Sequence, residues 1–135
     1  MVIRLCRYKK ENKELVTYLV YEAHNEPGYI AQVKEFVTEL FADLPKGNVY
    51  YIKKSLRKIL RILNKQVKYS GQPRTELELR IFFCVQVREA KVPVKSNTVL
   101  SNMYAQQLKK INAILDKLPE DLQADYETEL TRIKL

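Results

Sequence analysis

The sequence predicts an all-α protein, folded as a compact up-down helical bundle of five to six helices. Apolar residues recur at helical spacing in long stretches, and the 3 Gly and 5 Pro of the 135 residues fall at or near the ends of those stretches. This length suits one domain whose core is large enough to fold without disulfides. We therefore expect residues 1–135 to form a single helical domain.

The first two helices are expected at about 8–24 and 27–44. Each carries one apolar stripe. The break between them is marked by Asn25, which can cap a helix, and by Pro27, which the first helical turn tolerates. Pro45 and Gly47 end the second helix, and Asn48 can cap the next one.

The helix expected at about 48–69 has the most regular pattern. Its apolar residues lie within an arc of about 100° when successive residues are placed 100° apart. These residues are Ile52, Leu56, Ile59, Leu60, Leu63 and Val67. Such a stripe is typical of a helix that packs one face on a core. Gly71 and Pro73 mark its end.

The segment at about 75–91 has two interpretations. Its apolar residues alternate strictly, as in a strand: Leu77, Leu79, Ile81, Phe83, Val85 and Val87. Against a strand, Thr75 followed by Glu78 fits a capping box, and the only candidate partner strand is 2–5. We predict a helix that is apolar almost all round. We expect this helix to lie nearest the centre of the bundle, followed by the helix at 48–69.

The last two helices are expected at about 96–118 and 119–133. Ser96 or Asn97 can begin the first of them. Pro119 followed by the acidic Glu120 and Asp121 suits the start of the second, by geometry and by the helix dipole. Short connections between amphipathic helices favour antiparallel neighbours, which predicts the up-down order.

Several classes of protein are excluded by composition. The longest strongly apolar stretches have seven residues, whereas a membrane-spanning helix needs about 20. Residues 1–10 lack the apolar core of a secretion signal, so we expect a cytoplasmic protein. Cys6 and Cys84 are expected to be buried free thiols. A metal site at Glu22, His24 and Glu26 is disfavoured by the helix break beside it, so we expect no metal and no cofactor.

No catalytic motif is present. A phosphate-binding glycine loop, a dinucleotide fingerprint and a nucleophile elbow are all missing from the sequence. The acidic pairs at 76/78 and 120/121 read first as helix N-terminal charges. No set of residues therefore suggests an active site. An enzyme ranks third, after two kinds of binding module, because helical bundles can host active sites in their cores.

The net charge of +8 is concentrated in one part of the chain. Residues 44–75 contain nine Lys and Arg and no acid, so the remainder sums to −1. Seven of the nine occupy one arc of about 140° on the helix at 48–69, opposite its apolar stripe. We call these seven the basic stripe: Lys53, Lys54, Arg57, Lys58, Arg61, Lys65 and Lys68. Tyr50 falls within the arc, and Tyr51, Ile62 and Tyr69 lie at its margin.

The basic stripe predicts a non-catalytic binding module that contacts the backbone of a nucleic acid. Such a face can neutralise several phosphates, and nearby tyrosines can stack on unpaired bases. No zinc finger, basic zipper or RNP-type pattern indicates that a base sequence is read.

Three alternatives remain open. In the first, the protein is an interaction or self-assembly module whose basic stripe meets an acidic partner surface. Residues 116–129, with six acids and one Lys, are such a surface, in this chain or in a second copy. The others are an anionic lipid surface and a solvated face without a partner.

Two segments resemble parts of a family of small uncharacterised bacterial helical proteins. They are residues 7–15 (RYKKENKEL) and 53–61 (KKSLRKILR). The resemblance extends over most of the chain. No function is attached to that family, so the resemblance implies no activity, cofactor or partner.

Overall fold

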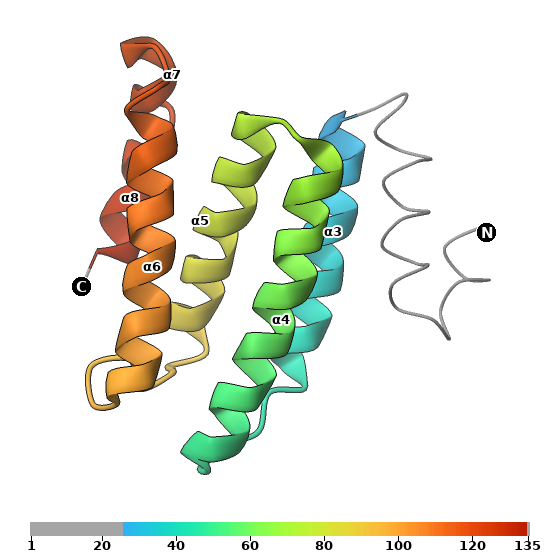
Figure 1. Ribbon diagram of the computed structural model, residues 1–135, viewed down its shortest axis with the longest axis vertical. Coiled ribbons are helices and arrows are strands. Elements are labelled where there is room, and N and C mark those ends of the chain that lie inside the picture. Colours follow the sequence, from blue (N-terminus) through green and yellow to red (C-terminus); the bar gives the residue numbers. More distant parts are fainter. Residues whose placement is uncertain (1–25, 135) are drawn as a thin grey trace, which may run out of the picture.

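The computed structural model describes residues 26–134, which form helices joined by short connections (Figure 1). In chain order these are α3 (Glu26–Ala42), α4 (Val49–Ser70), α5 (Pro73–Glu89), α6 (Thr98–Leu115), α7 (Glu120–Ala124) and α8 (Glu127–Ile133). The long helices α3 to α6 alternate in direction, and the described residues contain no strand. The predicted all-α, up-down bundle is thereby confirmed for this part of the chain.

Some predictions fall outside the described residues. They concern the helix at 8–24, the alternative strand at 2–5, Cys6, the cap at Asn25, and the alternative metal ligands Glu22 and His24.

α5 is the central helix of the bundle. α3, α4, α6 and α8 all pack against it, and Figure 1 shows it between α6 on one side and α4 on the other. Its buried residues are spread around most of the helix, because alternate residues of an α-helix lie about 200° apart. The strand-like alternation thus reflects burial on several sides. The helical interpretation is confirmed, with observed bounds about two residues earlier at each end than predicted.

α4 packs one face on the core and leaves the other to solvent. Ile52, Leu56, Ile59 and Leu63 are buried, as the pattern predicts. On the α3 side, Tyr29 is fully buried, and its hydroxyl shares its one proton between the side-chain Oε1 and the main-chain carbonyl of Gln66. This polar link gives a partner to the buried Tyr29 hydroxyl and to the buried Gln66 Oε1, as interior polar groups require. Of the two helices expected nearest the centre, α5 is enclosed and α4 is not.

The two ends of α4 are fixed by local chemistry. Asn48 has an extended backbone, and its side-chain oxygen accepts a hydrogen bond of 3.0 Å from the Tyr50 N–H, as its predicted role as a cap requires. At the other end Gly71 has φ +65°, and its N–H donates to the carbonyl of Val67 at 2.9 Å. A left-handed residue at this position closes the helix, and glycine adopts that conformation without steric cost.

Glu26 joins the ends of three helices. It lies in the first turn of α3, and its Oε1 accepts hydrogen bonds from the hydroxyl of Ser70 on α4, at 2.9 Å, and from that of Thr75 on α5. The predicted capping box of Thr75 and Glu78 is wrong. α5 begins at Pro73 with Gln72 as a cap that makes no side-chain hydrogen bond. The Thr75 hydroxyl instead donates to a carboxylate on a neighbouring helix, which is a stronger acceptor than a neutral group.

The last predicted helix, 119–133, is divided into two. α7 ends at Ala124, and α8 starts at Glu127 after a turn at Asp125 and Tyr126. This turn sends α8 back along α5 and buries Tyr126 and Ile133, which a straight helix beyond the end of α6 would leave in solvent. Core burial therefore outweighs the continuous helical pattern. None of the described helices is long and apolar enough to cross a membrane.

Replacing Gly71 should destabilise the helix end that completes α4. We expect Gly71→Ala to lower the free energy of unfolding by about 1–2 kcal/mol, because a Cβ is disfavoured at positive φ. Urea unfolding followed by circular dichroism measures the change. Lys58→Ala, at an exposed position within the same helix, is the matched control and should stay within about 0.5 kcal/mol of the parent. Equal effects of the two changes would contradict this account.

Candidate polyanion-binding site

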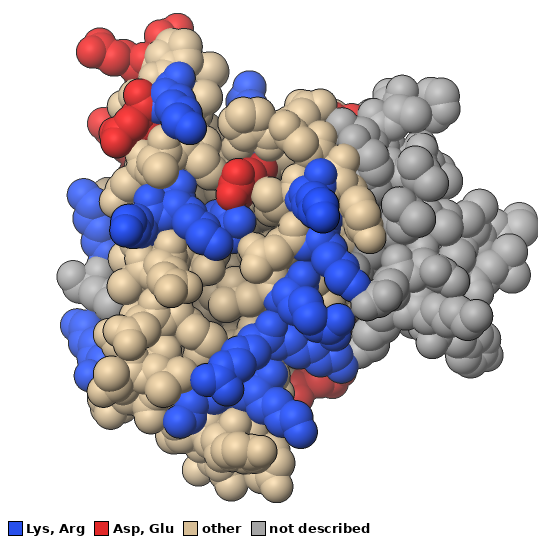
Figure 2. Space-filling view, viewed as in Figure 1, with Lys and Arg blue, Asp and Glu red and all other residues tan. Residues whose placement is uncertain are grey.

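The basic stripe lies on the solvent-facing side of α4. Figure 2 shows it as a blue band running along that helix. Five of its members are exposed and two, Lys53 and Lys65, are half-buried. The exposed five are Lys54, Arg57, Lys58, Arg61 and Lys68. The structure thus brings all seven predicted residues together on one helix face.

The charge of this face is not neutralised by acids of the described chain. Within residues 26–134, the ion pairs join Arg80 to Glu76 and Arg132 to Glu89, and neither involves α4. Arg61 and Lys65 make further interactions, but Lys54, Arg57 and Lys58 have no acidic partner in this part of the protein. α4 also has no acid in its first turn, where the helix dipole favours one. The dipole and the side chains therefore add to the same positive potential.

The acidic stretch 116–129 does not cover the basic stripe. Its six acids lie at the end of α6, in α7 and in the first turn of α8. In Figure 2 acidic side chains gather at the α7 end of the molecule, away from the blue band on α4. They are Asp116, Glu120, Asp121, Asp125, Glu127 and Glu129. The fold thus keeps the acidic and the basic surfaces apart.

An open groove of about 540 Å³ runs between α4 and α6. Its α4 wall includes four members of the basic stripe. The lining residues are Arg57, Leu60, Arg61, Asn64, Lys65 and Lys68 from α4, with Met103 and Gln106 from α6. An extended, negatively charged chain can lie along a groove of this kind, parallel to the helix.

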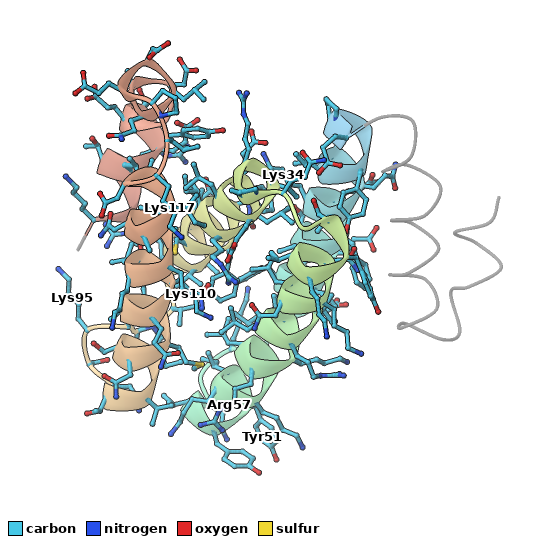
Figure 3. All side chains as sticks on the ribbon, turned by 45° about the horizontal axis from the view of Figure 1, so that its top comes forward. Lys34, Tyr51, Arg57, Lys95, Lys110 and Lys117 are labelled. Atoms are coloured by element: carbon cyan, nitrogen blue, oxygen red, sulfur yellow. The ribbon has the colours of Figure 1, made fainter. Side chains whose placement is uncertain are left out.

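A basic residue that the sequence analysis missed, Lys110, lies on α6 near the groove, although it is not one of the lining residues. Lys110 is exposed and follows Gln106 by four residues and Met103 by seven, so the three lie on one face of α6. Figure 3 shows Lys110 on the side of α6 turned toward α4. The spacing shows that these residues share a face, but only the tertiary structure shows that this face borders the groove.

A buried arginine holds the elements around the groove in place. Arg80 of α5 is only 4% exposed. Its Nε donates to Glu76 Oε2 at 2.7 Å, and its Nη1 donates to Asn64 Oδ1 at 3.1 Å and to Gln107 Oε1 at 2.9 Å. These bonds connect α5 to α4 and to α6, the two helices that form the groove. Sequence reasoning missed Arg80 because it interrupts an apolar run without a recognisable motif.

The two remaining basic residues of the acid-free segment 44–75 do not extend the basic stripe. Lys46 lies between α3 and α4. Arg74 is in the first turn of α5, and its Nε donates to the hydroxyl of Tyr126 at 3.1 Å. Arg74 thus links α5 to the turn between α7 and α8. The stripe is confined to the one helix on which it was predicted.

Cys84 is a fully buried free thiol, as predicted. Burial raises the pKa of this thiol to about 12, so it is protonated at neutral pH and is a poor nucleophile. No cluster of three or more His, Cys, Asp or Glu side chains suited to a metal ion is found between residues 26 and 134.

Comparison of the chain with protein-family models, with curated proteins and with solved structures gives no match. Its function is therefore inferred from the geometry of the site.

Removing the Arg80 side chain should leave a buried acceptor without its donor. We expect Arg80→Met to lower the free energy of unfolding by about 1–3 kcal/mol, because Gln107 is 3% exposed and cannot bond to water instead. Adding Gln107→Leu removes that acceptor, so the double variant should lose less than the sum of the two single changes. Urea unfolding of the four proteins gives the coupling energy. Strictly additive losses would show that the Arg80–Gln107 bond does not stabilise the bundle.

Alkaline pH should destabilise the protein partly through Cys84. The pKa of the folded thiol is about 12, against an ordinary value of 9.0. Between these values an unfolded chain loses the proton and the folded one keeps it. This contribution to stability is therefore complete below pH 9 and falls by about 1.4 kcal/mol per pH unit above it. Unfolding free energies measured from about pH 8 to 11 should fall less steeply for Cys84→Ala than for the parent, and identical slopes would refute the contribution.

Proposed function

We propose that this protein is a non-catalytic module that binds the phosphate backbone of a nucleic acid along the basic stripe. The observation that carries this proposal is the acid-free, exposed face of α4, which the acids of residues 116–129 leave uncovered. We propose that it acts in the cytoplasm, on the sequence argument alone.

The dimensions of the basic stripe suit a phosphate chain. From Lys53 to Lys68 it extends for about 24 Å at 1.5 Å per residue. When Lys and Arg side chains contact phosphates, condensed counterions are released. A protein that uses such contacts therefore binds strongly at low salt without reading the nucleotide sequence. This agrees with the lack of a sequence-reading motif. The groove beside α4, with Lys110 across it, supplies a track along which a flexible chain can lie.

A charge-reversal pair tests the proposal. Lys54→Glu/Arg57→Glu changes two exposed residues that have no acidic partner among residues 26–134 and lowers the formal charge from +8 to +4, two units for each change. Labelled RNA and DNA oligonucleotides, both single- and double-stranded, are titrated by fluorescence anisotropy at about 50 and 200 mM salt. The parent should bind with a log–log salt slope of several times 0.7–0.9, and the variant should bind at least about tenfold more weakly with a smaller slope.

The matched control is Lys95→Glu/Lys134→Glu. It has the same net charge, but both residues are exposed away from α4, and Figure 3 shows Lys95 on the opposite side of α6 from the groove. We expect it to bind nearly as well as the parent. Equal losses in both variants would mean that net charge alone drives binding, and no binding by the parent at the lower salt would remove the nucleic-acid proposal.

A second candidate function is self-assembly. The same chain carries a basic face on α4 and a separate acidic end at α7, so the two can meet between copies in a head-to-tail contact. Sedimentation velocity without oligonucleotide, at about 50 mM salt, separates the two candidates. Concentration-dependent assembly that Lys54→Glu/Arg57→Glu abolishes would favour self-assembly.

A further inference from the structure

We infer that the nucleic acid is single-stranded, and that its unpaired bases stack on Tyr50 and Tyr51 at the start of α4. This inference rests on the proposed function and adds the class of strand and the residues that hold the bases.

Tyr50 and Tyr51 are the exposed large apolar side chains of the described protein. Their exposed fractions are 63% and 52%, so more than half of each side chain faces solvent. The other tyrosines within residues 26–134 differ: Tyr29, Tyr104 and Tyr126 are buried in the core, and Tyr69 is half-buried. The exposure of this pair is therefore not a general property of the tyrosines of this fold.

The two rings form one small platform. Their centroids are 5.2 Å apart and their planes meet at 78°, an edge-to-face contact. This is a favourable arrangement for two aromatic rings. Each ring still has a large solvent-accessible surface on which a planar base can stack.

The platform is continuous with the basic stripe. Tyr50 precedes Arg57 by seven residues and Lys54 by four, so it lies on the same face of α4, one to two turns from them. Figure 3 shows Tyr51 and Arg57 together at this end of the helix. A strand whose phosphates follow the stripe thus reaches the two rings with its next nucleotides.

This combination favours a single strand over a duplex. In a duplex each base is covered by its stacked neighbours, so exposed tyrosine rings gain little from it. In a single strand every base has a free face, and stacking on an aromatic side chain is tolerant of sequence. Proteins that bind single strands without sequence preference combine a positively charged groove along the backbone with aromatic side chains on which the nucleobases stack.

The test compares strands that have equal charge and differ in their bases. The probes are a labelled oligothymidylate of about 12 nucleotides, an abasic strand of the same length, and a hairpin duplex that has the same number of phosphates. The variants are Tyr50→Ala/Tyr51→Ala and, as the matched control that keeps both rings, Tyr50→Phe/Tyr51→Phe. Because the chain contains no Trp, quenching of tyrosine emission on binding gives a second readout.

We expect the parent to bind oligothymidylate more tightly than the abasic strand, by about five- to 150-fold for each stacked base. The alanine variant should lose that advantage and bind both strands as the parent binds the abasic one. The phenylalanine variant should keep it. The salt slope should be the same in all three proteins, because the phosphate contacts are unchanged.

The outcomes separate this inference from the proposed function. If the parent binds no strand, both fail. If it binds abasic strand and oligothymidylate equally, or prefers the duplex, the stacking inference fails while backbone binding stands. The inference also fails if the alanine variant weakens all probes alike, if the phenylalanine variant loses as much as the alanine variant, or if the alanine variant changes only the sedimentation of the protein. In that last case the platform belongs to a contact between copies.

Discussion

The bundle depends on the need to cover α5 on most of its circumference. Its apolar residues point to several sides, so no single neighbour can remove them from water, and α3, α4, α6 and α8 each cover part of the helix. Burial of each large apolar side chain contributes about 1.5–3 kcal/mol, which makes this enclosure the largest favourable term in the fold. The same requirement explains why the chain turns at Asp125 and Tyr126, since α8 must return to α5. It also leaves α4 with one buried face and one face free for charge.

The polar interactions of the interior determine where the enclosing helices lie. A charged Arg80 within α5 is costly to bury unless it is paired and hydrogen-bonded. Glu76, Asn64 and Gln107 meet that requirement from three helices. Because Asn64 also lines the groove, the bond network under the groove fixes its α4 wall relative to α6. The candidate site is therefore supported by hydrogen bonds that join three helices.

The sequence predicts the helices well because periodicity and capping are local properties. The bounds of α4 are predicted to within one residue, since Asn48 and Gly71 act within one turn of the helix. The basic stripe is predicted for the same reason: all seven residues lie on one helix. Thr75 is assigned the wrong partner because its acceptor, Glu26, is 49 residues away in sequence. Lys110 and Arg80 are missed since their roles depend on which helix faces which across the groove, and periodicity within one helix does not carry that information.

The energy of the basic stripe favours a role in binding over a role in folding. Its like charges at i, i+4 spacing, such as Arg57 with Arg61, cost about 0.2–0.5 kcal/mol per pair, and four such pairs cost about 1–2 kcal/mol. Burial of one large apolar side chain of α4, such as Leu63 or Ile59, offsets that cost. α4 therefore does not need an anionic partner in order to fold. Lys54, Arg57 and Lys58, which have no acidic partner among residues 26–134, then keep their positive potential in the free protein, and a bound polyanion that relieves the repulsion would also stabilise the folded state.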